Sequence, residues 1–149
     1  MIKIAVTGHR PPRLEGKIDK IQFWLEEQLT NLKACYKDVA LITGMAAGVD
    51  QMAAVAAIKL GISVYCYFPY RYKLSDINQY IVDNAEKVIY CAETYENRGT
   101  YIARDRKMVE DCDILLAVYD GKPTGGAYYT YEYGKTMGKN IFLYPWDYR

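Results

Sequence analysis

The feature that most constrains the fold is a regular alternation of short apolar runs with longer amphipathic stretches. The apolar runs are mostly β-branched or aromatic, which is typical of strands buried on both faces of a sheet. They cover residues 2–7, 39–43, 62–68, 87–91, 114–119 and 141–144. Strand and helix patterns follow one another along the whole chain, and this order favours right-handed crossovers. We therefore expect an α/β fold with a mainly parallel sheet of about six strands and helices on both faces.

The helical stretches have clear periodicity or end signals. The first has apolar residues every three or four positions, namely Ile18, Ile21, Leu25, Leu29 and Leu32. Further helices are predicted at residues 49–60, 76–86, 101–112 and 127–137. Gly61 is placed as a C-terminal cap and Ser75 as an N-terminal cap. Residues 70–73 have no clear pattern and are left without an assignment.

Composition indicates an ordinary globular protein. The chain has 149 residues, of which 51% are hydrophobic and 25% charged, with a net charge of +1. This size fits one domain over residues 1–149. The charge gives no electrostatic reason to propose duplex DNA or an anionic membrane as partner. Because no signal region or membrane-length apolar stretch is visible, we expect a cytoplasmic protein without membrane contact.

The residues that commonly bind metals are sparse. The four cysteines are scattered without a CxxC pair and the chain has one histidine, His9; the cysteines are Cys35, Cys66, Cys91 and Cys112. Too few ligands lie at metal-binding spacing for a zinc site. We expect reduced cysteines, no metal and no resident cofactor.

Glycines and turn residues gather after three of the predicted strands. These segments read TGHRPPR from Thr7, TGMAAGVD from Thr43 and YDGKPTGGAYYTYEYG from Tyr119. Carboxyl ends of parallel strands meet at one edge of the sheet, and ligands bind there at the topological switch point. The three segments are therefore expected to form one crevice.

The second segment is almost free of large side chains. Gly44, Met45 and Gly48 precede a predicted helix, whose bare N-terminus would suit a phosphate. Asp50 lies where it could accept a ribose hydroxyl or favour the helix dipole. Glycine at such a turn also occurs for tight packing alone, and GMAAG matches neither a Walker loop nor GxGxxG. Gly125-Gly126 before a later helix strengthens the phosphate interpretation, because two such turns would converge.

The first segment offers further candidates. His9 and Arg10 could contact a ligand at the end of the first strand, together with Thr7 and Gly8. The alternative is a loop histidine whose partners are backbone groups, with Arg10 and Arg13 at the surface.

In order along the chain, TGHRP, TGMAAGVDQMAA, RDRKMVEDCDILLAVYDG and GGAYYTYEYG resemble the YpsA-like branch of the SLOG superfamily. That superfamily joins the DNA-processing protein DprA and the "lonely guy" cytokinin-activating phosphoribohydrolases. The resemblance extends from about residue 4 to residue 142. It implies a Rossmann-like three-layer sandwich that binds nucleotides or molecules derived from them.

The lonely-guy enzymes carry an arginine before the fifth strand and a PGGxGTxxE signature after it. The resemblance places Arg104 at the arginine position, with Arg106 as competitor, and Glu132 at the signature glutamate. This chain departs from the signature, because Thr124 replaces the proline and Tyr128-Tyr129 replace Gly-Thr. The resemblance thus implies binding more directly than hydrolysis.

Three function classes remain. We favour binding or sensing of a nucleotide-type ligand; the alternatives are a nucleotide N-glycosidase and a DprA-like binder of single-stranded nucleic acid. The low net charge argues against the third class, and whether the ligand is hydrolysed stays open. Glu132 and Arg104 are the candidate catalytic pair. The expected ligand-binding residues are Thr7, Gly8, His9, Arg10, Gly44, Met45, Gly48, Asp50, Arg106, Gly125, Gly126 and Thr130.

The high aromatic content predicts self-association. Aromatic residues make up 14% of the chain, more than the core needs, so we expect a homo-oligomer, most simply a dimer. Trp24 with Phe23, or the run YYTYEY, would supply the apolar surface.

Overall fold

The computed structural model describes residues 1–146, which form twelve elements connected by short loops. The strands are β1 (Ile2–Gly8), β2 (Val39–Thr43), β3 (Ser63–Phe68), β4 (Lys87–Tyr90), β5 (Ile114–Val118) and β6 (Asn140–Leu143). The helices are the 3-10 turn η1 (Pro11–Leu14) and α1 (Ile18–Tyr36), α2 (Val49–Lys59), α3 (Asp76–Asp83), α4 (Arg98–Asp111) and α5 (Gly126–Thr136).

The strands form one sheet in the order β4-β3-β2-β1-β5-β6, and each neighbouring pair is parallel. The prediction of a Rossmann-like α/β fold is confirmed. From β1 the chain builds the sheet toward β4 and then returns across it to place β5 on the other side of β1. The switch point therefore lies between β1 and β5, whose carboxyl ends define the expected ligand edge.

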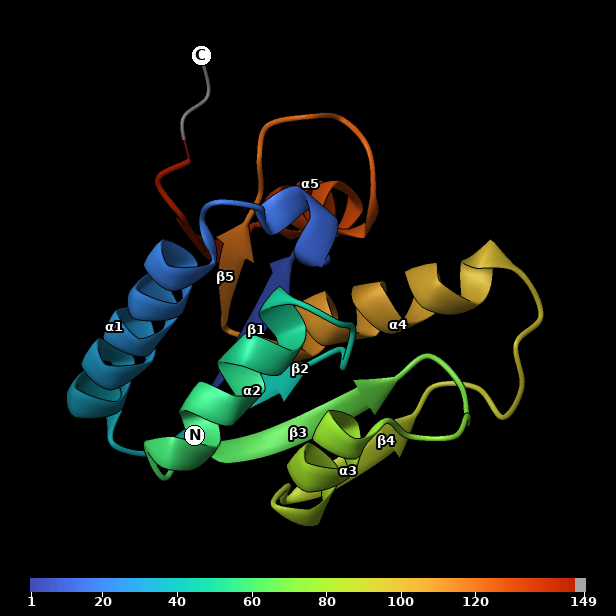
Figure 1. Cartoon of the computed structure of the whole chain (residues 1–149), viewed down its shortest axis with the longest axis horizontal. Helices are drawn as coiled ribbons and strands as arrows, with labels where there is room; N and C mark the ends of the chain where they lie inside the picture. Colours follow the sequence, from blue (N-terminus) through green and yellow to red (C-terminus); the bar gives the residue numbers. More distant parts are fainter. Residues whose placement is uncertain (147–149) are drawn as a thin grey trace.

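The two faces of the sheet are covered by different helices (Figure 1). α1, α2 and α3 pack on the face to which Ile4 and Val6 point, where the larger core cluster lies. α4 contributes Met108 to the opposite core cluster, on the face to which Ala5 points, and α5 packs beside α4. Because side chains alternate along β1, Thr7 lies on the α4–α5 face.

Some helix ends differ from the predicted ones by a few residues, and capping residues set where α3 and α4 begin. Ser75 is the N-cap of α3, and its Oγ accepts a hydrogen bond from the Asn78 amide at 3.3 Å. α4 begins at Arg98, three residues earlier than predicted, because Asn97 and Thr100 form a reciprocal capping box. Residues 70–73 belong to no regular element.

The structure separates the two residues expected to supply an oligomer surface. Trp24 is buried and packs edge-on against Tyr144 at 5.6 Å between ring centroids, whereas Phe23 is 67% exposed. Trp24 is therefore a core residue, and the homo-oligomer stays a prediction. Within residues 1–146, no helix combines the length and apolar character needed to cross a membrane.

Candidate functional site

A pocket of about 370 Å³ opens at the carboxyl ends of β1 and β5, between the loops that follow β1 and β2 and the helices α4 and α5. Pockets for small ligands have volumes of this order. Its lining residues are Thr7, Gly8, His9, Arg10, Arg13, Ala46, Asp50, Tyr101, Arg104, Asp105, Gly125, Gly126, Ala127 and Thr130. The three glycine-bearing segments and α4 thus meet where the topology predicted.

The N-terminus of α5 faces this pocket. Gly125, the N-cap residue, has φ +93° and no side chain caps the helix. The first amides of a helix have no intrahelical partner and carry the positive end of its dipole. Gly125, Gly126 and Ala127 all line the pocket. This helix end can therefore receive an anion, and a phosphate fits its chemistry.

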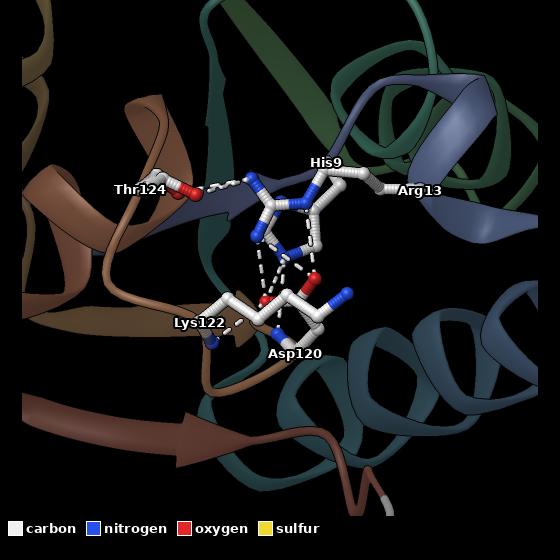
Figure 2. A network of polar contacts seen from close by, with 5 residues as sticks. All are labelled: His9, Arg13, Asp120, Lys122 and Thr124. Carbon is white, nitrogen blue, oxygen red and sulfur yellow. Dashed lines mark hydrogen bonds and ion pairs between the residues drawn. The ribbon is translucent and has the colours of Figure 1, made fainter.

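A partly buried polar network holds the loop before α5 in place (Figure 2). Arg13, from η1, binds the Asp120 carboxylate with Nε at 3.0 Å and Nη2 at 2.7 Å, and its Nη1 donates to the Thr124 carbonyl at 2.9 Å. Burial acts to raise the pKa of Asp120, but hydrogen bonds from Arg13 and the Lys122 amide outweigh it, so the pKa is lowered. The charged pair fixes the Gly125 turn to the segment after β1.

His9 belongs to the same network. Its Nε2 accepts a hydrogen bond from the Asp120 amide at 3.0 Å, so the ring is neutral at that nitrogen. Burial lowers the pKa of His9, although the Asp120 carboxylate opposes this. His9 lines the pocket, but its Nε2 holds the loop after β5, as in the loop-histidine alternative.

The loop after β2 shapes the site from behind. Its left-handed residue is Met45, with φ +66°, and not Gly44. Gly44 is demanded by close approach, because a Cβ there would lie 2.9 Å from Arg104 Nη1 and 3.0 Å from Asp50 Oδ2. Neither Gly44 nor Met45 lines the pocket, whereas Ala46 does.

Gly48 also lies outside the pocket lining. It has φ +96°, and a Cβ on it would lie 2.5 Å from the His9 carbonyl oxygen. The next amide, that of Val49, donates to the same oxygen at 3.3 Å. The N-terminus of α2 is thus packed against the segment after β1. Of the two glycine-marked helix ends, α5 and not α2 presents its N-terminus to the pocket.

Two acids and one arginine form the buried charged group of the pocket. Arg104 Nε binds Asp105 Oδ1 at 2.8 Å, while its Nη1 donates to the carbonyl of Gly44. Asp50 Oδ2 accepts the Ala46 amide at 3.2 Å. Both acids lie close to Arg104, so the guanidinium is held rigidly between α4 and the loop after β2.

Burial dominates the protonation of both acids. Burial, helped by the nearby Asp105 carboxylate, raises the pKa of Asp50 to about 7 against the opposing charge of Arg104. Burial likewise raises the pKa of Asp105, although Arg104 and Thr130 oppose it. One guanidinium cannot keep two buried carboxylates fully ionised. The pocket therefore holds a carboxyl that changes charge near neutral pH.

Glu132 and Arg106 lie elsewhere. They line a second pocket of about 170 Å³ between α4 and α5, which shares only Asp105 and Thr130 with the first. Glu132 Oε1 pairs with Lys135 at 3.1 Å, and the Arg106 guanidinium lies 5.3 Å from the Tyr133 ring centroid. Glu132 and Arg104 thus do not face one another across one pocket, because they project into neighbouring ones.

Sequence reasoning missed five lining residues, namely Arg13, Ala46, Tyr101, Asp105 and Ala127. Tyr101, Arg104 and Asp105 are spaced i, i+3 and i+4, which places them on one face of α4. That spacing was the available signal once Arg104 was a candidate. Within residues 1–146, no group of three or more His, Cys, Asp or Glu side chains is arranged to hold a metal ion.

The chain is similar to known proteins in fold, and no similarity is found at the level of family models or curated sequences. No protein-family model and no curated protein matches the chain. DNA processing protein A (DprA) from Streptococcus pneumoniae shares the fold with a TM-score of 0.78 at 20% identity, over 99% of this chain and 51% of that one. The present chain thus spans about half the length of the pneumococcal protein.

Two further structures share the fold. The single-stranded-DNA-binding DprA from Helicobacter pylori aligns with a TM-score of 0.70 and 18% identity, over 98% of this chain and 66% of that one. The structural-genomics target TM1055 aligns with a TM-score of 0.67 and 14% identity, over 95% of this chain and 72% of that one. All three share the α/β fold described above.

Replacing Gly48 by alanine should destabilise the protein by roughly 1–3 kcal/mol, because the methyl group combines a left-handed strain with a collision at the His9 carbonyl. Gly16→Ala is the matched control, since Gly16 has φ +78° but no described atom within 4 Å of the position that the added methyl would take. Urea unfolding of both variants measures the difference. Equal losses at the two sites would contradict the close-packing role of Gly48.

Asp50→Asn should change how stability depends on pH. The folded Asp50 carboxyl, with its pKa near 7, keeps a proton that the unfolded chain has already lost above about pH 4. The unfolding free energy of the wild type should therefore fall relative to Asp50→Asn as pH rises from about 4 to 7, and then level off. Urea unfolding across this range tests it, with the exposed Asp83→Asn as control. A constant difference would mean that Asp50 is already ionised throughout.

Proposed function

We propose that this protein binds a nucleotide or a nucleotide-derived molecule in the pocket at the carboxyl ends of β1 and β5. The observation that carries the proposal is the uncapped N-terminus of α5, lined by Gly125 and Gly126, which opens into a pocket of about 370 Å³. A phosphate at this helix end would accept hydrogen bonds from free amides. Arg104, on the adjacent wall, adds a fixed positive charge.

The acids of the pocket support a ligand that also carries hydroxyl groups. Asp50 and Asp105 line the pocket beside Arg104, and a carboxylate can accept hydrogen bonds from the hydroxyls of a ribose, as it does in dinucleotide-binding Rossmann folds. Phosphate at one end and ribose beside it are the chemistry of a nucleoside phosphate. The fold shared with DprA and the sequence resemblance support membership of the SLOG superfamily. The sequence resemblance alone supports the YpsA-like branch within it.

Gly126→Val should lower the affinity for a nucleoside monophosphate by about tenfold or more, because the valine side chain would occupy the space of the phosphate at the α5 N-terminus. The charge-assisted hydrogen bonds that are then lost are worth roughly 1.5–3 kcal/mol. A Cβ at Gly126 has only Asp105 Oδ2 near it, at 3.9 Å, so the fold should tolerate it. Calorimetric titration with AMP measures the affinity, and the melting temperature of the ligand-free variant serves as control. Unchanged affinity in a folded variant would place the anion elsewhere.

A second candidate function is cleavage of the N-glycosidic bond of the bound nucleotide. It is favoured by Asp50, whose pKa of about 7 allows the carboxyl to donate a proton near neutral pH. Asp105, held by Arg104, is a carboxylate that could activate water or stabilise an oxocarbenium-like centre. In this version the acids of the main pocket take the part that the family signature gives to Glu132.

Measurement of base release from nucleoside monophosphates separates the two functions. If the protein is a hydrolase, Asp105→Asn should lower the rate by about a hundredfold, the usual scale for an acid or base. Glu132→Gln, at a neighbouring pocket, should leave it nearly unchanged. Loss of activity in Glu132→Gln alone would instead restore the catalytic pair of the family signature. No release by the wild type above the uncatalysed rate would leave binding as the function.

Single-stranded nucleic acid is the remaining class of ligand. The net charge of +1 argued against it, but the Helicobacter pylori protein that shares this fold binds single-stranded DNA. A phosphorylated strand end presents a phosphate, a pentose and a base, as a free nucleotide does, although the pentose of DNA lacks the 2′-hydroxyl group. We therefore keep it as a source of the ligand chemistry that this pocket would accept.

A further inference from the structure

Four tyrosines form a continuous ring cluster next to the pocket, and only Tyr72 among them packs on a core ring, that of Phe68 at 5.5 Å between centroids. Tyr70 is its centre, with ring centroids 5.2 Å from Tyr72, 5.7 Å from Tyr95 and 5.9 Å from Tyr101. Tyr95 and Tyr101 lie 5.9 Å apart. We call these four residues the tyrosine cluster.

The cluster is assembled at the ligand edge of the sheet. Tyr70 and Tyr72 follow the carboxyl end of β3, Tyr95 follows that of β4, and Tyr101 stands in the first turns of α4. Tyr101 is also a lining residue of the main pocket. Because Tyr101 precedes Arg104 and Asp105 by three and four residues, it lies on the same face of α4, one turn closer to the N-terminus of the helix.

The cluster is partly open to solvent, because two of its rings are exposed while Tyr70 and Tyr101 are half-buried. Tyr95 is 52% exposed and Tyr72 is 38% exposed, although aromatic rings gain most from burial. The hydroxyls of Tyr70 and Tyr101 lie 3.3 Å apart and bond to one another, which fixes the Tyr101 ring at the rim. A fixed, partly exposed aromatic surface beside a polar pocket is suited to stacking a planar group.

A positively charged side chain lines the same pocket as Tyr101. Arg10 is exposed and lines the pocket. Hydrogen bonding to Tyr70 and burial raise the pKa of Tyr101, while the charges of Arg10 and Arg104 act to lower it. Arg10 also acts to lower the pKa of Tyr72. A guanidinium near aromatic rings can cover the second face of a planar ligand group.

We propose that the tyrosine cluster, through Tyr101, is the subsite for the nucleobase of the bound nucleotide, with the phosphate at the N-terminus of α5 and the ribose beside Asp50 and Asp105. This inference rests on the proposed function and fixes the direction in which the ligand lies. Stacking accepts any base, because each base has a π face. The subsite therefore distinguishes base-bearing ligands from bare sugar phosphates.

Calorimetric titration with the four ribonucleoside 5′-monophosphates and with ribose 5-phosphate tests the subsite. Tyr101→Leu keeps apolar bulk and helix propensity but removes the ring. It should weaken the best nucleotide by about tenfold, within the range found for loss of base stacking, and leave ribose 5-phosphate within about twofold of the wild type. Tyr101→Phe, which keeps the ring, should restore most of the nucleotide affinity.

Tyr129→Leu is the matched control. Tyr129 is exposed on α5 and lines the second pocket but not the main one, so this variant should bind every ligand as the wild type does. Equal affinity of the wild type for nucleotides and ribose 5-phosphate would overturn the subsite while leaving phosphate binding intact. A Tyr101→Leu variant that keeps full nucleotide affinity would do the same. If neither kind of ligand binds, the proposed function itself fails, and the subsite with it.

A short single-stranded oligothymidylate distinguishes the source of the base. If the pocket takes a free nucleotide, the oligonucleotide should bind no more tightly than thymidine monophosphate. If the pocket takes the end of a strand, the oligonucleotide should bind more tightly than the monophosphate. Tyr95→Ala should then remove part of this gain, because Tyr95 lies outside the pocket lining and would contact only a further base. In both cases the effect of Tyr101→Leu supports the subsite. If Tyr101→Leu leaves both ligands unaffected, the subsite is excluded.

Discussion

The ion pair between Arg13 and Asp120 joins the two halves of this fold at the point where they separate. The chain leaves β1 to build the sheet in one direction and later returns through β5 to build it in the other. The two strands pair as far as Gly8 and Val118, and beyond these residues side chains connect the loops that follow. Arg13 makes most of that connection, because its Nε and Nη2 donate to the Asp120 carboxylate and its Nη1 donates to the Thr124 carbonyl. His9 adds to it by accepting the Asp120 amide. Gly125 must then turn where a side chain would meet the Arg13 guanidinium. The position of the α5 N-terminus depends on this contact.

Arg104 has the corresponding role on the other wall. Hydrogen bonds to a carboxylate and to a backbone carbonyl hold its guanidinium, so little of its conformational freedom remains to be lost when a ligand binds. The cost of this arrangement is the burial of Asp50 and Asp105 around a single cation. Such groups are unfavourable for stability in isolation and are frequently found where a ligand or a reaction uses them.

The sequence was sufficient for the fold because its signals are local and repeated. Each strand was recognised by its apolar run, and the parallel order followed from alternation with helices. The crevice followed as well, since Gly125-Gly126 and the residues after β1 lie where topology requires. The sequence did not show in which direction the side chains on α4 and α5 point. Glu132 matched a family signature by counting, but its direction on α5 depends on how the helix is rotated against α4.

The glycines after β2 show the same limit. Gly48 was expected to leave room for a phosphate, and the structure uses that room for the His9 carbonyl. A glycine in a sequence indicates that something approaches closely, and whether it is a ligand or the chain itself depends on contacts between distant segments. Asp105 was overlooked for a related reason: a charged residue on an amphipathic helix resembles a solvent-facing one until its neighbours are known.

The path of α4 has a mechanical consequence. This helix leaves the β4 edge of the sheet and returns to β5, so it is the one long connection between the outer strand and the switch point. Its first turns carry Tyr101 and Arg104, while the opposing contact on a ligand comes from α5. A molecule held between them would link two helices that otherwise touch only side by side, and would oppose any separation of α4 from the sheet. Occupancy of the pocket would then restrain the helix that connects the outer edge strand to the switch point.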